Sequence, residues 1–274
     1  GLRNKLMNRI SDYTNLCDRI VTFLEQYRKD SGMDSFVVGV SGGIDSAVAS
    51  TLAAHTGSPV YVLGMPIHQK PEQENLSDEH IHWLKMNYPN VRGLKYDLTN
   101  VFESFKTALG DEGVEDLPLA NTRSRLRMVT LYQVAGLHRG LVVGTGNKVE
   151  DYGVGFYTKY GDGGVDIAPI ADLYKSEVWE LGTHLGVNPR IVTAPPTDGL
   201  WDDGRTDEEQ LGASYQDLEW VMESKIFEHA SDPLNETQWV GKELDPIQLT
   251  AIKQYHKFNT QNKHKMEPIP TFKL

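Results

Sequence analysis

The chain alternates between short apolar runs and longer segments in which apolar residues recur every three or four positions. The short runs occupy residues 36–40, 60–65, 93–96 and 141–144. The most apolar of them are typical of strands that are buried on both faces. Helical patterns, or small helix-forming residues, lie around them at residues 16–29, 47–54, 71–88, 101–109 and 119–138. This alternation predicts an α/β fold, with a doubly wound and mainly parallel sheet flanked by helices in a Rossmann-like arrangement.

The second half of the chain is less regular. Residues 144–169 are rich in glycine, with aromatic and charged side chains interleaved, and this composition is typical of a functional loop. Residues 172–185 and most of 206–258 have helical patterns, and a polar tail with two prolines follows at 259–274. The sequence contains no repeat and no low-complexity tract, and we expect residues 1–274 to form a single domain.

The segment Ser41–Ser46 lies between the first predicted strand and the helix that follows it, and it reads Ser-Gly-Gly-Ile-Asp-Ser. Two glycines allow the backbone to approach an anion closely, and the first amides of the helix can donate to that anion. The segment lacks the lysine and the spacing of a Walker A motif, and the G-x-G-x-x-G dinucleotide fingerprint is also absent. We therefore predict a phosphate-binding loop of another kind; the alternative is an ordinary strand-to-helix turn that contains glycines.

Asp45 is the unexpected residue of this loop, because a bare carboxylate would repel a phosphate group. A divalent cation between the carboxylate and the phosphate removes the repulsion, so we assign Asp45 to Mg²⁺. The alternative is that Asp45 only caps the N-terminus of the helix.

Charge and cysteine content narrow the classes of partner. The 27 Lys and Arg residues against 38 Asp and Glu residues give a formal net charge of −11, and this acidity argues against a nucleic-acid partner. No apolar run approaches the roughly 20 residues that span a bilayer, so no membrane association is expected. Cys17 is the sole cysteine, which excludes an intrachain disulfide; we expect a buried filler rather than a catalytic thiol, in a cytoplasmic protein.

The loop resembles that of the N-type ATP pyrophosphatases, an adenine nucleotide alpha hydrolase-like superfamily that cleaves ATP between its α- and β-phosphates. Two further segments are more specific: residues 144–150 read Gly-Thr-Gly-Asn-Lys-Val-Glu, and residues 155–166 read Gly-Phe-Tyr-Thr-Lys-Tyr-Gly-Asp-Gly-Gly-Val-Asp. Together with Leu173-Tyr174-Lys175, they resemble the signature of the ammonia-dependent NAD synthetases. The resemblance extends to the His264-Lys265 pair, although some family members have Asp-His-Ala-Ala at residues 146–149.

The resemblance implies roles for individual residues. Contacts to ATP are implied for Ser41, Gly42, Gly43, Ile44, Asp45, Ser46, Thr145, Lys175 and Thr197. Contacts to deamido-NAD are implied for Arg125, Lys159, Asp166, His264 and Lys265. Asp45 and Glu150 are implied as ligands of Mg²⁺, although a glutamate considered alone is more often a solvated surface charge. We expect Arg123 and Arg127 to be surface or ion-pair residues, and we predict no zinc site at His80 and His82, which do not share a helix face.

The activity implied by the resemblance is that of a carbon–nitrogen ligase. ATP would activate the nicotinate carboxylate of deamido-NAD as its adenylate, and ammonia would displace AMP, giving NAD, AMP and pyrophosphate without a protein nucleophile. The sequence leaves no room for the nitrilase-like glutaminase domain of larger relatives, so free ammonia is the expected nitrogen source. Family members are homodimers. Two rival hypotheses are another adenylating or tRNA-thiolating enzyme with the same loop, and a regulatory module that binds a nucleotide without turnover.

Overall fold

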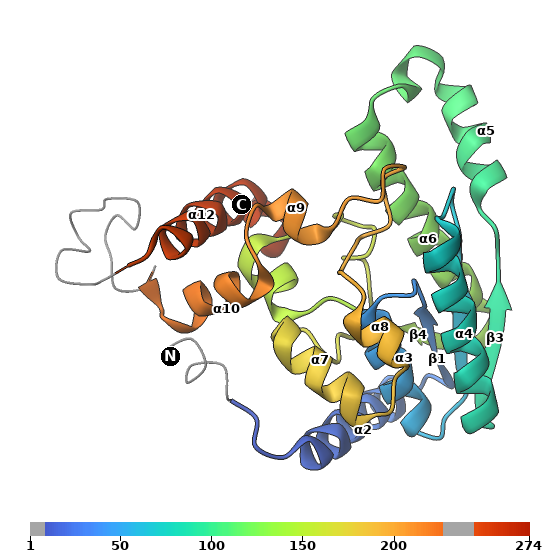
Figure 1. The fold of residues 1–274 in the computed structure, drawn as a ribbon. Coiled ribbons are helices and arrows are strands. Elements are labelled where there is room, and N and C mark those ends of the chain that lie inside the picture. Colours follow the sequence, from blue (N-terminus) through green and yellow to red (C-terminus); the bar gives the residue numbers. More distant parts are fainter. Residues whose placement is uncertain (1–8, 227–243) are drawn as a thin grey trace.

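A parallel sheet lies in the right-hand part of the molecule as drawn in Figure 1. Within residues 9–226 and 244–274, which the computed structural model describes, its strands run in the order β3-β2-β1-β4. Their bounds are β1 (Ser35–Gly39), β2 (Val60–Gly64), β3 (Val91–Lys95) and β4 (Gly140–Val142). All neighbouring pairs are parallel, with Gly39 opposite Leu63 where β1 and β2 end. The predicted parallel α/β sheet is confirmed, and the strands lie within two residues of their expected positions.

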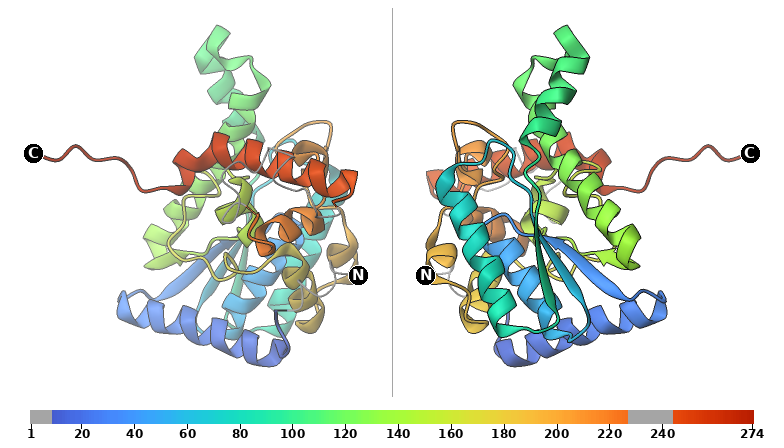
Figure 2. Two further views of the ribbon diagram at one scale, coloured as in Figure 1. Left: turned by 90° about the vertical axis from the view of Figure 1, so that its left-hand side faces the viewer. Right: turned by 90° about the vertical axis from the view of Figure 1, so that its right-hand side faces the viewer.

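Helices cover both faces of this sheet, as the doubly wound prediction requires (Figures 1 and 2). On one face, the core joins Phe36, Val38 and Val62 to α2 (Tyr13–Asp30), α3 (Ile44–His55), α4 (Pro71–Asn87), α7 (Lys175–His184) and α8 (Pro189–Thr193). On the other face, Val37, Leu63 and Val142 pack against α5 (Thr99–Leu109) and α6 (Asp116–His138), which are connected by η1 (Gly110–Gly113). Cys17 is buried in the first of these cores, as predicted.

Small residues let α3 lie directly beneath the sheet. Ala47, Ala49 and Ala53 are buried along it, so the helix is enclosed between β1, α2 and α7. Gly182 of α7 faces the start of α3, where an added Cβ would lie 2.6 Å from Cδ1 of Ile44. The first residue of α7 also lies beside the first residues of α3, which belong to the predicted phosphate loop, because Lys175 contacts Asp45.

The C-terminal elements form a second layer beside the sheet, visible on the left of Figure 1. They are η2 (Val149–Val154), α9 (Asp207–Leu211), α10 (Tyr215–Glu223) and α12 (Pro246–Met266). Val154, Tyr174, Tyr215 and Leu218 form their shared core. The predicted helical stretch 206–258 agrees with these helices, except that its residues 227–243 lie outside the described part of the chain. None of the described helices has the length and apolar character needed to cross a membrane.

Two predictions for this region are wrong in detail. Residues 149–154 form a π-helix inside the segment expected to be a loop, and α12 continues through residues 259–266, which were expected to be a polar tail. The two segments contact each other directly. The side chains of Asn259 and Asn262 donate to the carbonyl oxygens of Gly153 and Val154, at 2.8 and 2.9 Å, so tertiary hydrogen bonds hold a polar segment helical against the π-helix.

Candidate active site

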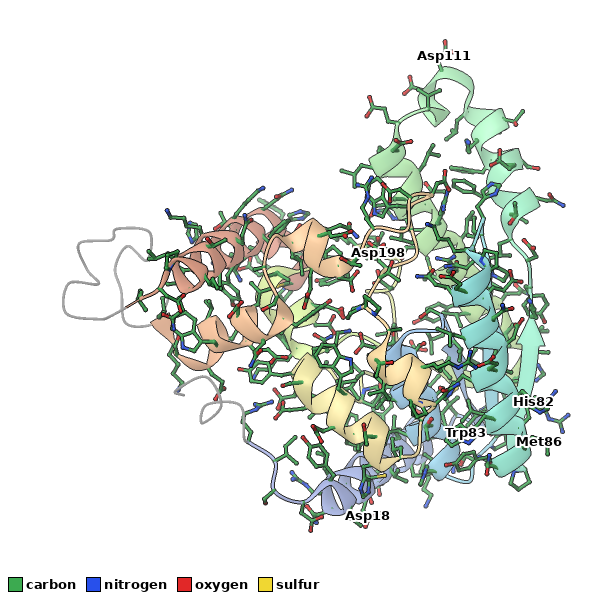
Figure 3. The ribbon with its side chains drawn as sticks, viewed as in Figure 1. Asp18, His82, Trp83, Met86, Asp111 and Asp198 are labelled. Atoms are coloured by element: carbon green, nitrogen blue, oxygen red, sulfur yellow. The ribbon has the colours of Figure 1, made fainter. Side chains whose placement is uncertain are left out.

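A cavity of about 480 Å³ opens beyond the carboxyl ends of the strands. Its walls come from the loops after β1, β2 and β4, from α6, and from the loop after α8 that carries Asp198 (Figure 3). Open parallel sheets bind ligands at this edge, because the loops that follow neighbouring strands converge there. The two segments that the sequence singled out, Ser41–Ser46 and the glycine-rich stretch after β4, therefore face one space.

The loop Ser41–Ser46 has a backbone suited to an anion. Gly42 has a φ of +90°, and an added Cβ would lie 2.5 Å from the carbonyl oxygen of Gln73, so only glycine fits there. Ser41 donates its N–H to Oγ of Ser46 at 3.0 Å, which closes the turn. The amides at the start of α3, at Ile44, Asp45 and Ser46, have no acceptor within the helix by virtue of their position. Such amides form an anion-binding site at a helix N-terminus.

Asp45 and Glu150 are joined through one amide group. Nδ2 of Asn147 lies 2.8 Å from Oε1 of Glu150 and 3.5 Å from Oδ2 of Asp45, and Asn147 is fully buried. Burial, and then the charge of Asp45, raise the pKa of Glu150 well above its usual range. Two carboxyl groups in this position repel each other unless a cation or a proton intervenes.

These carboxyl groups have the donor chemistry that a hard divalent cation needs. Oδ1 of Asp45 is buried and accepts no hydrogen bond from the described residues, so it is free for a further ligand. The described residues contain no group of three or more His, Cys, Asp or Glu side chains arranged around a metal. Mg²⁺ is commonly held by one or two carboxylates together with phosphate oxygens, so Asp45 and Glu150 fit a cation that arrives with a nucleotide.

Lys175 is the buried cation of this group. Its Nζ lies 2.5 Å from Oδ2 of Asp45 and 4.8 Å from the ring centre of Tyr215. Burial opposes its charge, but Asp45 and then Glu150 raise the pKa of Lys175 above its usual value, so it stays protonated. Glu177 accepts a hydrogen bond of 2.8 Å from the N–H of Tyr174, the residue before α7, and this contact fixes Lys175 as the first residue of the helix.

A further carboxyl group closes the cavity on the side of α9 and α10. Asp207 is buried and accepts a hydrogen bond of 3.0 Å from the hydroxyl of Tyr215. Burial raises the pKa of Asp207 to about 7. The sequence did not single out Asp207, because an aspartate at the first position of a short helix is ordinary in a sequence pattern.

The residues predicted to contact ATP lie together in the structure. The cavity is lined by Ser41, Gly42, Gly43, Ile44, Asp45, Ser46, Thr145, Lys175 and Thr197, and also by Glu150. Thr197 donates its hydroxyl to the carbonyl oxygen of Arg205 at 3.1 Å and so helps to shape the loop after α8. These residues come from four separate parts of the chain.

The residues predicted to contact deamido-NAD lie outside this cavity. The structure describes all five of these residues, and none of them lines the cavity: Arg125, Lys159, Asp166, His264 and Lys265. Arg125 is exposed and donates to the carbonyl oxygen of Lys159 at 3.1 Å, and His264 is exposed near the end of α12. Asp166 accepts from the hydroxyl of Tyr132 and from the amide of Val142, both at 2.8 Å.

Lys265 differs from the other members of that set because its ammonium group is already in use. Its Nζ donates to the carbonyl oxygens of Gly155 and Tyr157, at 2.7 and 2.6 Å. Burial lowers the pKa of Lys265. In this structure Lys265 therefore holds the segment after the π-helix against α12.

Arg123 and Arg127 of α6 were both expected to be surface or ion-pair residues, and the structure confirms this for Arg123 alone. Arg123 is buried and pairs with Asp202 at 2.9 Å, as an ion-pair residue should. The expectation for Arg127 is wrong: it lines the cavity, and no described carboxylate forms an ion pair with it. Positions 123 and 127 share a helix face, and that face points inward because it is continuous with Ala120 and Ser124.

The fold and the site together define an α/β protein in which a strand leads into an amide-lined loop of the anion-binding kind, with a pair of carboxylates beside it. Residues 16–269 match the NAD synthase family, so the chain belongs to that family.

Individual relatives cover most of the chain. The NH(3)-dependent NAD(+) synthetase of Methanosarcina mazei is 36% identical over 268 residues, which are 94% of this chain and 98% of the relative. That of Thermococcus kodakarensis is 40% identical over 219 residues, covering 78% of this chain and 82% of the relative. Among solved structures, the NMN synthetase of Francisella tularensis superposes with a TM-score of 0.82 at 29% identity, over 97% of this chain and 100% of that one.

Proposed function

We propose that this chain joins ammonia to the nicotinate carboxylate of deamido-NAD and converts ATP to AMP and pyrophosphate, giving NAD. The observation that carries the proposal is the meeting of the Ser41–Ser46 loop, Lys175 and the Asp45–Glu150 pair in one cavity. Membership of the NAD synthase family supports it, as do relatives named NH(3)-dependent NAD(+) synthetases at 36% and 40% identity.

In the first step, an oxygen of the nicotinate carboxylate attacks the α-phosphorus of ATP. A bond forms between that oxygen and phosphorus, and the bond from phosphorus to the bridging oxygen breaks, so pyrophosphate leaves with the electron pair. The amides at the start of α3 bind the departing phosphates, and Lys175 supplies a protonated ammonium beside them. No protein nucleophile is required, because positioning and charge stabilisation are sufficient for phosphoryl chemistry of this kind.

Mg²⁺ is the proposed cofactor, and ATP is the co-substrate. When bound, the ion would neutralise charge on the leaving pyrophosphate. Asp45 and Glu150 would hold it, since one oxygen of Asp45 has no partner in the described structure. A cation between the two groups would also offset the charge of Asp45, which raises the pKa of Glu150. Asn147 keeps both carboxyl groups oriented through its single amide.

In the second step, ammonia attacks the carbonyl carbon of the adenylate. A carbon–nitrogen bond forms, the carbon–oxygen bond to AMP breaks, and one proton is released from nitrogen. Loss of AMP is far easier than loss of oxide from a free carboxylate, which explains why ATP is consumed. We propose free ammonia as the nitrogen source and the cytoplasm as the compartment.

We propose that deamido-NAD extends from the cavity towards Arg125, Lys159, Asp166, His264 and Lys265, and that two chains form a homodimer. The family resemblance motivates both proposals. Apolar side chains on the outer face of α6 support a second copy there, because Val129 and Leu137 are 57% and 69% exposed. The neighbouring positions Leu126, Tyr132 and Val134 pack into the chain's own core and give no such support.

A second candidate substrate is nicotinate mononucleotide, the acid that a synthetase of NMN would amidate. The TM-score of 0.82 to the NMN synthetase of Francisella tularensis, with complete coverage of that chain, favours this candidate. Both acids present the same carboxylate, so the adenylation step is common to the two reactions. They differ in the adenylyl half of deamido-NAD.

Product analysis tests the proposal and separates the two candidates. The chain is incubated with ATP, Mg²⁺, ammonium and equal concentrations of deamido-NAD and nicotinate mononucleotide, and the products are measured by mass spectrometry. NAD is expected as the main amide, with AMP and pyrophosphate in equal amounts. A control with glutamine in place of ammonium should give little NAD, and one without either acid should release no pyrophosphate. Formation of ADP would contradict the proposal, and NMN as the main amide would establish the second candidate.

A further inference from the structure

Arg127 is held rigidly at the wall of the cavity. Its Nε donates to the carbonyl oxygen of Met65 at 2.9 Å, and its Nη2 donates to Oε1 of Gln69 at 3.1 Å. Gln69 is fixed in turn, because its amide donates to Oε1 of Gln73 on α4. A guanidinium has five N–H donors, so this clamp orients the group and leaves donors over.

The charge of Arg127 is only partly balanced by the protein, through Asp198 and Asp162, neither of which forms an ion pair with it. Lys175, the other cation withdrawn into the cavity, pairs with Asp45, whereas no described carboxylate lies within ion-pair distance of Arg127. Burial, and then repulsion from Arg123, lower the pKa of Arg127 to about 10. A half-buried charge without an ion-pair partner is unfavourable, so its presence at a cavity wall indicates an anionic ligand.

The strand register brings the clamp next to the phosphate loop. Gly39 of β1 is opposite Leu63 of β2. Ser41 follows Gly39 by two residues and Met65 follows Leu63 by two residues, so Ser41 and Met65 lie at the same level beyond the sheet. Neighbouring strands are about 4.8 Å apart, a distance that a chain of phosphate groups can span. A phosphate chain whose end rests on Ser41–Ser46 therefore has its next group within reach of the guanidinium.

We propose that Arg127 binds a phosphoryl group of the reacting nucleotides, as a clamped fork that supplies two parallel hydrogen bonds. The inference rests on the proposed function, because it takes ATP and a phosphorylated acid as the ligands. Two sources share the chemistry: the α-phosphate of ATP, and a phosphate of deamido-NAD. Arginine suits the task better than lysine, since its planar fork matches two phosphate oxygens.

Calorimetric binding to variants distinguishes these sources. Arg127→Gln is expected to weaken either the Mg²⁺ complex of α,β-methylene-ATP or deamido-NAD by about 10- to 100-fold, the loss of hydrogen bonds from a charged donor. Arg127→Lys should recover part of that loss, because the charge remains and the fork does not. The matched control is Arg28→Gln: Arg28 is likewise half-buried and donates to a backbone carbonyl, that of Met33, but lies on α2. It should leave both affinities unchanged.

Three results would overturn the inference. One is an effect below about twofold on both ligands in a folded Arg127→Gln protein, with folding checked by thermal melting. Another is an equal loss for both ligands in the Gln and Lys variants alike, which indicates a structural role. The third is a loss for deamido-NAD but none for NAD, which would assign the contact to the carboxylate. Since binding needs no turnover, a wild-type chain that binds ATP without forming NAD would contradict the proposed function alone.

Discussion

Asp45→Asn is expected to lower kcat/KM for ATP by about 10³-fold at fixed Mg²⁺, because the charge that attracts the cation is lost and a bound metal contributes several kcal/mol to the transition state. The Mg²⁺ concentration for half-maximal rate should rise in the same variant. Asparagine retains the shape of the side chain, so the change isolates the charge. Steady-state kinetics across a Mg²⁺ titration measures both effects.

The control for this variant is Asp111→Asn. Asp111 is exposed at the tip of the α5–α6 hairpin, far from the cavity (Figure 3), and its removal alters the net charge equally. It should leave kcat/KM and the Mg²⁺ requirement unchanged. Asp45→Asn also takes from Lys175 its nearest carboxylate, so a fall in melting temperature is expected and folding must be verified at the assay temperature. A rate within about threefold of wild type would remove Asp45 from the site, since the lost free energy would then be below about 1 kcal/mol.

Gly42→Ala is expected to lower kcat/KM for ATP by about 10²-fold, since a displacement of about 1 Å at a reacting centre has effects of that size. An added Cβ would lie 2.5 Å from the carbonyl oxygen of Gln73, so the loop has to move away from α4. The amides that face the phosphates move with it. Binding of ATP and steady-state kinetics should both register the change.

Gly57→Ala separates displacement of the loop from backbone strain. Gly57 has a φ of +77°, close to the +90° of Gly42, but an added Cβ there meets no atom within 4 Å. Both substitutions should reduce stability by about 1–2 kcal/mol, the cost of a left-handed conformation for alanine. Only Gly42→Ala should affect kinetics. Equal kinetic losses in the two variants would show that the position of the Ser41–Ser46 loop does not govern catalysis.

Much of the fold could be predicted because its signals are local. The strands at 36–40 and 60–65 are apolar runs that only a doubly covered sheet accommodates, and the structure buries them on both faces. The phosphate loop could also be predicted from its two glycines, since the positive φ of Gly42 disfavours other residues at that position.

The parts that could not be predicted depend on contacts between distant segments. Residues 259–265 are polar throughout, and they are helical because Asn259 and Asn262 donate to carbonyls of the π-helix more than a hundred residues earlier. The position of Asn147 between two carboxyl groups also depends on this π-helix, because the π-helix carries Glu150. Arg127 had a usable signal, the helical spacing from Arg123, but α6 is too weakly amphipathic for the sequence to reveal which face is inward.

The most direct test of acyl adenylation follows oxygen from one substrate to one product. Deamido-NAD labelled with ¹⁸O in its nicotinate carboxylate is converted with unlabelled ATP, Mg²⁺ and ammonium, and the spent nucleotide is analysed by mass spectrometry. Attack of the carboxylate on the α-phosphorus, followed by cleavage of the carbon–oxygen bond, transfers one labelled oxygen to AMP. Unlabelled AMP, or label recovered in inorganic phosphate together with ADP, would contradict this mechanism.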